Sequence, residues 1–427
     1  MQIQKDEIIE LFKKNWVEGY INITTSNSKS LEYTPLHDEV SLDSSLNITT
    51  NITIIQNHKK ASFSIDGYSF LKLKNAFLEL KNIVDFSEYD EDIVQILIKD
   101  EDFCDFSNKK IDDIWFDYMQ KEFEKFKNYN FKEWIKIEWF EIDVISTTHT
   151  HINSLWAYKT QSDNESSVTY VLFWEYENNR EDDYEQIEKK DIPKVILSDI
   201  EKLETRLLNK IQPSSNTIKS WFYNITLDRD VVIDFLQLLI WWLSAESMRE
   251  GTSMLSKYSI WDKIISDKIT IINNPFLEWY TWNILFDKEW ITQKKTTLFE
   301  KWVLKSKFYD YKNARKEGLE NLWNSKITNI EIIWETSPKF LDETKILITN
   351  LMAYHTVDSS TWKFSLNGEW YLIENWEKKW FIKNISLSWS VIWLFENIIA
   401  IWDDFKDTWN YKVPSITFEN QEIIWNT

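Results

Sequence analysis

The side chains best suited to metal chemistry are histidines, and this chain of 427 residues has only five of them. His149 and His151 are separated by one residue, which places both imidazoles on one face of a β-strand. A catalytic zinc needs three protein ligands, so without a third ligand we interpret the two as an exposed pair. No HExxH or HExxxH pattern occurs, so no helix carries two histidines as zinc ligands. Cys104 is the only cysteine, which excludes an internal disulfide and a cysteine metal cluster.

Motifs for nucleophilic catalysis and phosphate binding are also missing. Ser253 follows Gly251-Thr252, but the GxSxG frame of a nucleophile elbow does not surround it. No GxGxxG or Walker A motif is present, even with additional glycines restored as described below, so no phosphate cradle is expected. The acidic pairs Asp182-Asp183 and Asp403-Asp404 are interpreted as turn or surface groups.

The charge and hydropathy of the chain limit its partners. A formal charge of −20 argues against a nucleic-acid partner, because phosphates are bound by Lys and Arg. No apolar run reaches the roughly 18 residues of a membrane span. Residues 1–15 carry three acids and lack the basic start and apolar stretch of a signal peptide. We therefore expect a cytoplasmic protein with no nucleic-acid and no membrane partner.

Tryptophan and glycine occur in reversed proportions. The chain has 25 Trp and 5 Gly, whereas ordinary usage of about 7% would give roughly 30 Gly. We interpret most of the Trp as glycines written through the wrong genetic code, in a lineage that reads UGA as glycine. Asn375-Trp376 lies between two apolar runs, where Asn-Gly would form a strong hairpin turn because both residues need positive φ. Glu300–Val303 and Asp287–Trp290 are predicted to be turns on the same grounds.

Genuine tryptophans remain the alternative interpretation. They would stack on sugars or other ligands and would then group on one exposed face. Trp115 is expected to be genuine, because it fits an apolar helical stripe with Ile111, Ile114, Tyr118 and Phe123.

The hydrophobic pattern predicts an α+β protein with two domains. Residues 1–211 are expected to form an N-terminal α+β domain, with sub-segments of about 1–107 and 108–211, and 217–427 a C-terminal, mostly antiparallel β-sheet domain with few helices. Residues 212–216 are the predicted boundary. The predicted helices are 5–16, 70–83, 109–127, 196–210, 229–243 and a stretch near 341–352. The predicted strands are 20–25, 39–42, 45–55, 61–65, three strands within 134–176, and 222–227.

Two further segments have distinct patterns. Asn57–Lys60 is predicted to join two strands as a hairpin. Residues 177–191 are dense in charge and are interpreted as a solvated face or loop. After residue 220 lie 19 of the 25 Trp, as a glycine-rich sheet domain with many turns would require.

With Trp read as Gly, residues 276–315 resemble the signature stretch of the TldD/PmbA family of metallopeptidase-related proteins. The family's F-D-x-E-G block corresponds to Phe286–Trp290, its E-N-G-V-L-K block to Glu300–Lys305, and its Y-x-A-R segment to Tyr311–Arg315, with one extra residue before Ala314. Ile382–Asp404, Thr361-Trp362 and Asn375–Glu377 resemble the family's terminal strands and turns. The resemblance covers most of the chain and is strongest over 245–427.

The family has two branches that pair with each other. One carries HExxxH in a helix before a G-T-S segment, and the other, the PmbA (TldE)-like branch, lacks it. Here Gly251–Ser253 is present, but Leu236–Trp241, where the motif would fall, holds no His and no Glu. The chain therefore resembles the metal-free branch.

This resemblance implies a non-zinc subunit of an intracellular metallopeptidase complex that acts in proteolysis or peptide maturation. It implies zinc in a TldD-like partner subunit, a peptide substrate, and no catalytic or metal-binding residue in this chain. Glu246, Arg249, Thr252 and Ser253 lie beside the missing motif and are candidate cleft or interface residues. Whether the chain has activity alone stays open. The alternative is a non-catalytic ligand-binding protein with genuine surface Trp, and a third option is a hydrolase with an unrecognised site.

Overall fold

The structure is a computed structural model of the chain. It describes residues 3–36, 38–94, 96, 98–177, 179–211, 219–278, 280–319, 325–334, 346–352, 357, 363–374, 377–408 and 410–425. The turn predicted at Asn375-Trp376, the Thr361-Trp362 pair and the boundary predicted at 212–216 lie outside the described residues, as do His37 and His355. Residues 3–211 are called the N-terminal domain below, and residues 219–425 the C-terminal domain.

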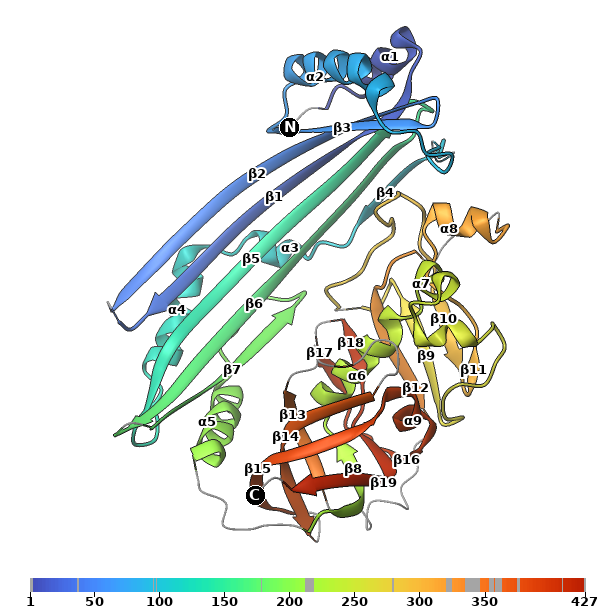
Figure 1. The fold of residues 1–427 in the computed structure, drawn as a ribbon. Coiled ribbons are helices and arrows are strands. Elements are labelled where there is room, and N and C mark those ends of the chain that lie inside the picture. The colour runs from blue at the N-terminus through green and yellow to red at the C-terminus, as the bar shows by residue number, and fades with distance from the viewer. Residues whose placement is uncertain are drawn as a thin grey trace.

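A seven-stranded sheet forms the N-terminal domain, in the order β3-β2-β1-β5-β6-β4, with β7 also paired to β6. Its strands are β1 (Glu18–Thr34), β2 (Glu39–Gln56), β3 (Lys59–Asp66), β4 (Glu101–Asp105), β5 (Ile135–Asn153), β6 (Tyr158–Tyr176) and β7 (Asn179–Lys189). The four strands β1, β2, β5 and β6 are unusually long and run the length of the domain (Figure 1). All pairs are antiparallel except β4 with β6.

All the helices of the N-terminal domain cover one face of this sheet. They are α1 (Lys5–Asn15), α2 (Phe70–Ile83), a 3-10 turn (Val84–Phe86), α3 (Lys109–Asp112), α4 (Phe116–Lys127) and α5 (Leu197–Ile211). On β1, Ile21 and Ile23 join the α1–α2 core, whereas Leu31 and Tyr33 join the core beneath α4 and α5. All four residues have odd numbers, and β1 pairs with β2 without a register shift. Since side chains alternate between the two faces of a strand, the four residues share one face. The even positions form the opposite, polar face.

The C-terminal domain contains two six-stranded sheets. Their orders are β11-β10-β9-β12-β18-β17 and β15-β14-β13-β8-β19-β16. The strands are β8 (Trp221–Leu227), β9 (Ile269–Asn274), β10 (Thr296–Glu300), β11 (Val303–Leu304), β12 (Asn329–Trp334), β13 (Ile346–Met352), β14 (Lys363–Glu374), β15 (Glu377–Ser390), β16 (Ile398–Ile401), β17 (Lys406–Thr408), β18 (Tyr411–Val413) and β19 (Ile416–Trp425). The helices are α6 (Arg229–Trp241), α7 (Ala245–Glu250), a 3-10 turn (Met254–Lys257), α8 (Tyr311–Lys316) and α9 (Val391–Glu396).

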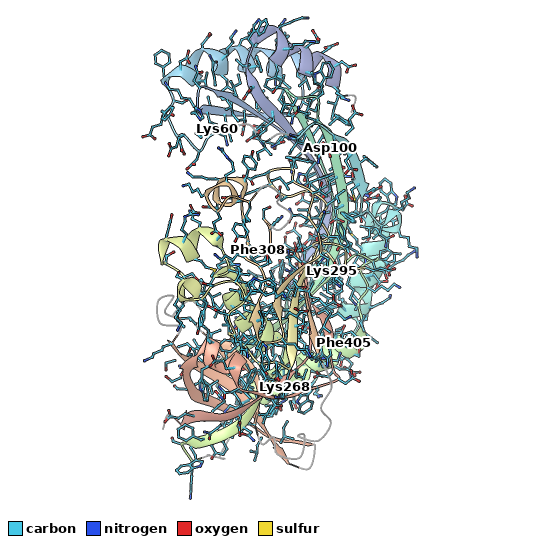
Figure 2. The ribbon with its side chains drawn as sticks, turned by 90° about the vertical axis from the view of Figure 1, so that its right-hand side faces the viewer. Lys60, Asp100, Lys268, Lys295, Phe308 and Phe405 are labelled. Atoms are coloured by element: carbon cyan, nitrogen blue, oxygen red, sulfur yellow. The ribbon has the colours of Figure 1, made fainter. Side chains whose placement is uncertain are left out.

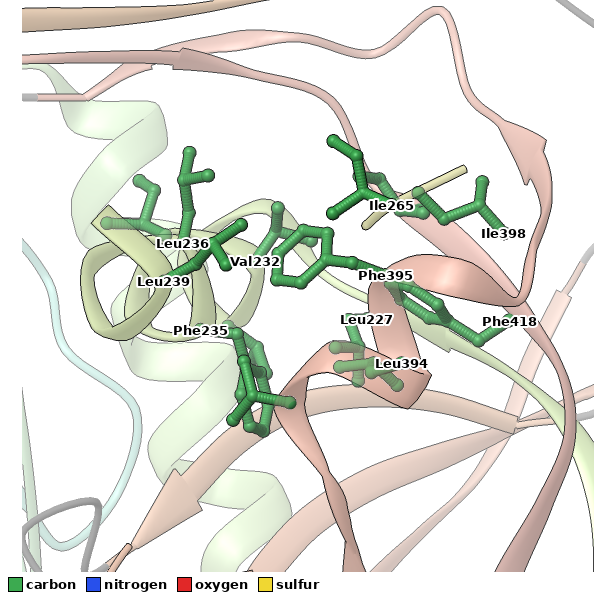
Figure 3. Packing of buried hydrophobic residues seen from close by; sticks show 14 of the residues in the cluster. Leu227, Val232, Phe235, Leu236, Leu239, Ile265, Leu394, Phe395, Ile398 and Phe418 are labelled. Atoms are coloured by element: carbon green, nitrogen blue, oxygen red, sulfur yellow. The ribbon is translucent and has the colours of Figure 1, made fainter. Parts of the chain in front are cut away.

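Helix α6 lies at the centre of the C-terminal core. Its apolar residues Val232, Phe235, Leu236 and Leu239 pack with side chains of α9, β16 and β19 (Figure 3). Figures 1 and 2 show this domain beside the long sheet. In Figure 2, Lys60 and Asp100 lie in the N-terminal domain, and Phe308, Lys295 and Lys268 lie in the C-terminal domain. The predicted α+β class, with a sheet-rich C-terminal part and few helices, is confirmed.

Several predicted elements are confirmed. The helices expected at 5–16, 70–83, 196–210 and 229–243 correspond to α1, α2, α5 and α6. Asn57 and His58, with φ of 51° and 61°, join β2 and β3 as the predicted hairpin. Lys301, with φ of 52°, lies in the predicted turn between β10 and β11.

Residues 134–176 form two long strands, not three. The middle of β5 and β6 is rich in Ser and Thr and has little apolar alternation. The strands continue because their hydroxyl side chains pair across the ladder: Thr148 Oγ1 lies 2.9 Å from Ser162 Oγ. The β1 strand continues beyond the predicted 20–25 through a similar Ser- and Thr-rich stretch.

The charge-dense segment 177–191 is not a loop, because Asn179–Lys189 is strand β7. Asp183 and Glu185 form ion pairs with Arg206 of α5, at 3.0 and 2.5 Å. The acidic side chains of β7 are thus neutralised by an arginine of α5. The local sequence pattern does not predict that this helix lies beside the strand.

Two helix predictions are wrong. Ile346–Met352 is strand β13, which lies parallel to β8 and buries Ile346 and Ile348 completely, so tertiary pairing decides its conformation. The helix expected over 109–127 is interrupted between α3 and α4, and Trp115 is the extended N-cap residue of α4. Its side chain is 68% exposed and lies under the Lys29 ammonium rather than in the apolar stripe.

Five of the described tryptophans have a backbone conformation that suits glycine. Trp16, Trp134, Trp156, Trp261 and Trp290 have φ between 55° and 83°, a region in which a bulky side chain is strained. The side chain of Trp370 is fully buried, and its indole N–H has no hydrogen-bond partner among the described residues. Exposed indoles are spread along the chain from Trp16 to Trp393.

No helix in the described part of the chain is long and apolar enough to span a membrane.

We predict that Trp16→Gly stabilises the protein. Trp16 ends α1 in the left-handed conformation, with φ of 55°, and is 92% exposed. Glycine removes a steric cost of about 1 kcal/mol there, and chemical denaturation measures the gain in unfolding free energy. The control is Trp221→Gly, at a 68% exposed position without positive φ in strand β8. Glycine weakens a strand, so an equal gain in both variants would contradict the prediction.

Candidate functional site

The polar face of the long sheet meets the C-terminal domain at the loop between β9 and β10. The Gln161 side-chain oxygen accepts the backbone N–H groups of Leu285, at 2.6 Å, and Phe286, at 3.0 Å. Gln161 is only 7% exposed. Ile98 and Ala157 of the N-terminal domain also pack against Phe286 and Trp290 in a small apolar cluster. This contact fixes the start of the F-D-x-E-W segment, which is a signature block in the resemblance.

Asp287 holds that segment in a tight turn. Its Oδ1 accepts the N–H groups of Glu289, at 2.8 Å, and Ile291, at 2.9 Å. Its Oδ2 accepts from the Gln293 amide, at 3.1 Å, and from the Ser325 hydroxyl. Burial raises the pKa of Asp287, and the hydrogen bonds that it accepts oppose this shift. The side chain therefore organises the turn and is not free to act on a ligand.

Lys159 adds a positive charge to this junction. Its Nζ lies 3.3 Å from the backbone oxygen of Trp290, 3.1 Å from Asp100 Oδ2 and 4.6 Å from the ring centre of Phe286. The contact with residue 290 uses a backbone carbonyl, so it persists whether that residue is Trp or Gly. Gln161 and Lys159 thus both bind the backbone of the turn.

The two spaced histidines share one face of β5, as predicted, and this is the polar face. The predicted exposed pair is wrong for His151, because only His149 is exposed. His151 is buried, its Nδ1 lies 2.7 Å from Asn22 Oδ1, and its ring stacks on Trp290. Burial, and then Lys159, lowers the pKa of His151 to about 3, so its imidazole is neutral. His149 Nδ1 lies 3.1 Å from Thr24 Oγ1, and partial burial and Lys326 lower its pKa.

Within the described residues, no group of three His, Cys, Asp or Glu side chains is arranged to hold a metal ion. The histidine pair therefore has no third ligand in that part of the chain. In that part of the chain the two histidines make hydrogen bonds and a ring contact at the domain junction.

The same turn is connected to helices α7 and α8. Glu289 Oε2 accepts the Tyr311 N–H at 2.8 Å, and Asp310 caps α8 by accepting the Asn313 N–H, also at 2.8 Å. The Asn313 side-chain oxygen accepts a hydrogen bond from Arg249 of α7. A continuous set of hydrogen bonds therefore extends from the F-D-x-E-W turn to the end of α7.

Helix α8 also contacts the N-terminal domain. Lys312 lies 3.1 Å and Lys316 3.0 Å from Asp92 Oδ2, and both ion pairs are partly exposed. Such pairs contribute little stability individually, but they orient α8 relative to the sheet.

The four predicted site residues have different surroundings. Glu246 and Thr252 are exposed, and Arg249 joins the network through Asn313. Ser253 is only 3% exposed; its hydroxyl donates to the Trp242 carbonyl at 2.8 Å and accepts the Leu255 N–H at 3.1 Å. It caps a 3-10 turn, so it is a structural residue and not an available nucleophile. Gly251, with φ of 75°, ends α7.

The helix at the position of the family's zinc motif does not fit a zinc ion. Leu236 and Leu239 of α6 are fully buried in the apolar core (Figure 3). Ile240 is also fully buried there, and Trp241 is 72% exposed. None of these side chains has a donor atom for zinc, which binds Cys, His and carboxylates. We derive no metal-dependent step for this chain.

Further along the polar face lies a group of acids with altered ionisation. Burial, and then the neighbouring Asp143, raises the pKa of Glu141 to about 7. Asp143 has a raised pKa for the same first reason. Glu32 faces Glu141 on β1 and accepts a hydrogen bond from the Trp139 indole at 2.9 Å. The acids form a negatively charged part of the face that lies away from the junction.

Comparison with known proteins agrees with this architecture. The PmbA/TldA metallopeptidase C-terminal domain model matches residues 221–424. The C-terminal domain belongs to the PmbA/TldD family. An uncharacterized protein of Methanocaldococcus jannaschii is 28% identical over 180 residues, which are 39% of this chain and 43% of that protein. The chain therefore aligns with less than half of that relative.

Solved structures of similar fold extend over both domains. A candidate modulator of DNA gyrase from Bacteroides thetaiotaomicron has a TM-score of 0.85 and 19% identity, and covers 99% of this chain and 98% of its own. A second candidate modulator of a DNA gyrase, from Thermotoga maritima, has a TM-score of 0.81 at 19% identity, over 98% and 99%. TldE from Thermococcus kodakarensis has a TM-score of 0.79 at 18% identity, over 98% and 99%. At these identities the likeness establishes the fold.

Sequence reasoning identified part of this junction. It singled out the F-D-x-E-W block by resemblance, but it missed Gln161 and Lys159, which lie more than a hundred residues earlier in a polar strand. Their alternation on one face of a strand was the only available signal, and many other polar side chains share it.

We predict that Gln161→Ala destabilises the junction by about 2 kcal/mol, because the two buried N–H groups of Leu285 and Phe286 lose their acceptor. Denaturant unfolding and limited proteolysis of the 276–293 loop measure the effect. Gln186→Ala is the control, since Gln186 lies on the same sheet face and its side chain donates to nearby Glu188, with no other bond among the described residues. Equal effects of the two substitutions would refute this role of Gln161.

We also predict that Glu141→Gln stabilises the protein at pH 8 but not at pH 4. A carboxyl with a raised pKa in the folded state stabilises the fold below its unfolded pKa, near 4.5, and loses that contribution as pH rises through about 7. After allowance for solvent screening, about 1 kcal/mol is expected at pH 8. Denaturation at both pH values measures it, with exposed Glu175→Gln as control. A pH-independent effect would contradict the prediction.

Proposed function

We propose that this chain is the metal-free, PmbA (TldE)-like subunit of a TldD/PmbA-type metallopeptidase complex in the cytoplasm. The observation that carries the proposal is α6: where the zinc-bearing branch has HExxxH, this chain has Leu236–Trp241, and its apolar side chains fill the core. Without ligands in α6, that helix cannot activate water by metal coordination. The fold likeness to TldE over nearly the whole chain is consistent with the assignment.

In this proposal the zinc and the general base belong to a TldD-like partner, and the substrate is a peptide cut during proteolysis or peptide maturation. This chain shapes the cleft and helps to admit extended peptides. Exposed Glu246 and Thr252, with Arg249 anchored to Asn313, are the proposed interface or cleft residues, and Ser253 supports them by capping the adjacent turn.

The test mixes the purified chain with a zinc-bearing member of the family and measures association and cleavage of unfolded peptides. We expect a stable complex and more cleavage than either protein gives alone. Arg249→Ala should weaken association about tenfold, a loss of about 1.4 kcal/mol. Arg180→Ala, a partly exposed arginine of β7, should leave it unchanged. No association and no gain in cleavage would reject the proposal.

We further propose that most tryptophans of the written sequence are glycines in the native protein. The positive φ angles of five Trp and the unpartnered indole of buried Trp370 support this reading. It removes the reason for the alternative function, because a ligand-stacking surface needs genuine indoles on one face. The intact mass of natively expressed protein decides: a mass that matches the written sequence would reject recoding.

A further inference from the structure

The outer edge of strand β2 has no strand partner over half of its length. β3 pairs with Thr49–Gln56 only, and in the described part of the chain no strand pairs with the outer edge of Glu39–Ile48. Residues 41–47 are exposed on both faces of the strand. The backbone N–H and C=O groups along this edge are therefore available to another strand.

This edge has few of the features that usually prevent pairing. Exposed edges are commonly blocked by Lys, Pro or a β-bulge. Glu39–Ile48 contains no Lys and no Pro, and its pairing with β1 proceeds without a register shift. Its only charged side chains are Glu39 and Asp43.

Two leucines of this edge are left uncovered. Val40 packs against the core beneath α4, and Ile48 packs against the core beneath α1 and α2. Between them, on the same face of the strand, Leu42 is 44% exposed and Leu46 is 65% exposed. The uncovered interval thus lies between the two groups of helices.

The segment is complementary to itself. If a second copy pairs antiparallel about a two-fold axis at Ser44, Leu42 of each copy lies opposite Leu46 of the other. The two leucine pairs then lie on one face, one on each side of the Ser44 pair and about 13 Å apart. Asp43 then lies opposite the hydroxyl of Ser45 and not opposite another carboxylate. Directly opposite apolar pairs of this kind stabilise an antiparallel ladder, and the two Asp43 carboxylates are diagonal neighbours and not directly opposite each other.

We propose that the β2 edge is a homodimer interface at which a second copy of this chain continues the seven-stranded sheet. The proposal goes beyond the proposed function and does not depend on it, because the edge belongs to the N-terminal sheet and α7 to the C-terminal domain. A single pair of strands with four leucines is a small interface, so micromolar affinity is expected.

Sedimentation velocity of the full chain over a micromolar concentration series tests the proposal. We expect a concentration-dependent monomer–dimer equilibrium that Leu46→Lys weakens at least tenfold. Leu71→Lys is the matched control, because Leu71 is similarly exposed, at 68%, but lies on α2. A chain that stays monomeric throughout, or an equilibrium that Leu46→Lys leaves unchanged, would overturn the proposal.

A cross-linking variant tests the register without relying on destabilisation. In a Cys104→Ser background, Ser44→Cys places two thiols across the two-fold axis, where paired Cα atoms lie about 4.5–5.5 Å apart and a disulfide can form. Ser62→Cys, at an exposed position of β3, is the control. We expect oxidised dimers only from Ser44→Cys, and their absence would contradict the two-fold register. Pairing of the edge with the zinc-bearing subunit in place of a second copy would likewise reject the proposal.

Discussion

The structure depends on how the backbone of the F-D-x-E-W turn is held against the long sheet. Gln161 accepts two backbone N–H groups of the turn, and Lys159 contacts its last carbonyl. Because these bonds involve backbone atoms, they do not depend on the side chain at position 290. From this fixed point, Glu289 positions α8 and Asn313 positions Arg249 of α7. The exposed end of α7 is thereby held in a defined place relative to the sheet.

Helix α6 has the opposite character, because its buried face is apolar and packs in the core. Its buried leucines and Phe235 fill the space between two sheets and α9. A zinc site in this helix would require charged or imidazole side chains in place of that packing, with the cost of burying them. The chain therefore has the fold of the family, and α6 contributes apolar side chains to its core.

The sequence predicted the parts of the fold in which local pattern and tertiary environment agree. Helices α1, α2, α5 and α6 have apolar stripes, and Asn57-His58 has turn chemistry. The failures occur where long-range pairing decides. The polar centre of β5 and β6 is held by Thr148 and Ser162 across the ladder, and the charges of β7 are matched by Arg206. Ile346–Met352 becomes a strand because β8 is available beside it.

The candidate site follows the same division. The block at Phe286–Trp290 was singled out by its resemblance to the family signature, and its turn was predicted from local residues. Gln161 was not, because its contacts are with a loop of the other domain, more than a hundred residues along the chain. Ser253 was singled out by its position, but its two hydrogen bonds assign it to a cap.

The zinc content of the natively decoded chain, purified alone, tests the central claim most directly. The packing of α6 predicts far less than one zinc per chain, whereas its complex with a zinc-bearing family member should contain zinc. One zinc per isolated chain that survives dialysis would contradict the assignment of this protein as the metal-free subunit.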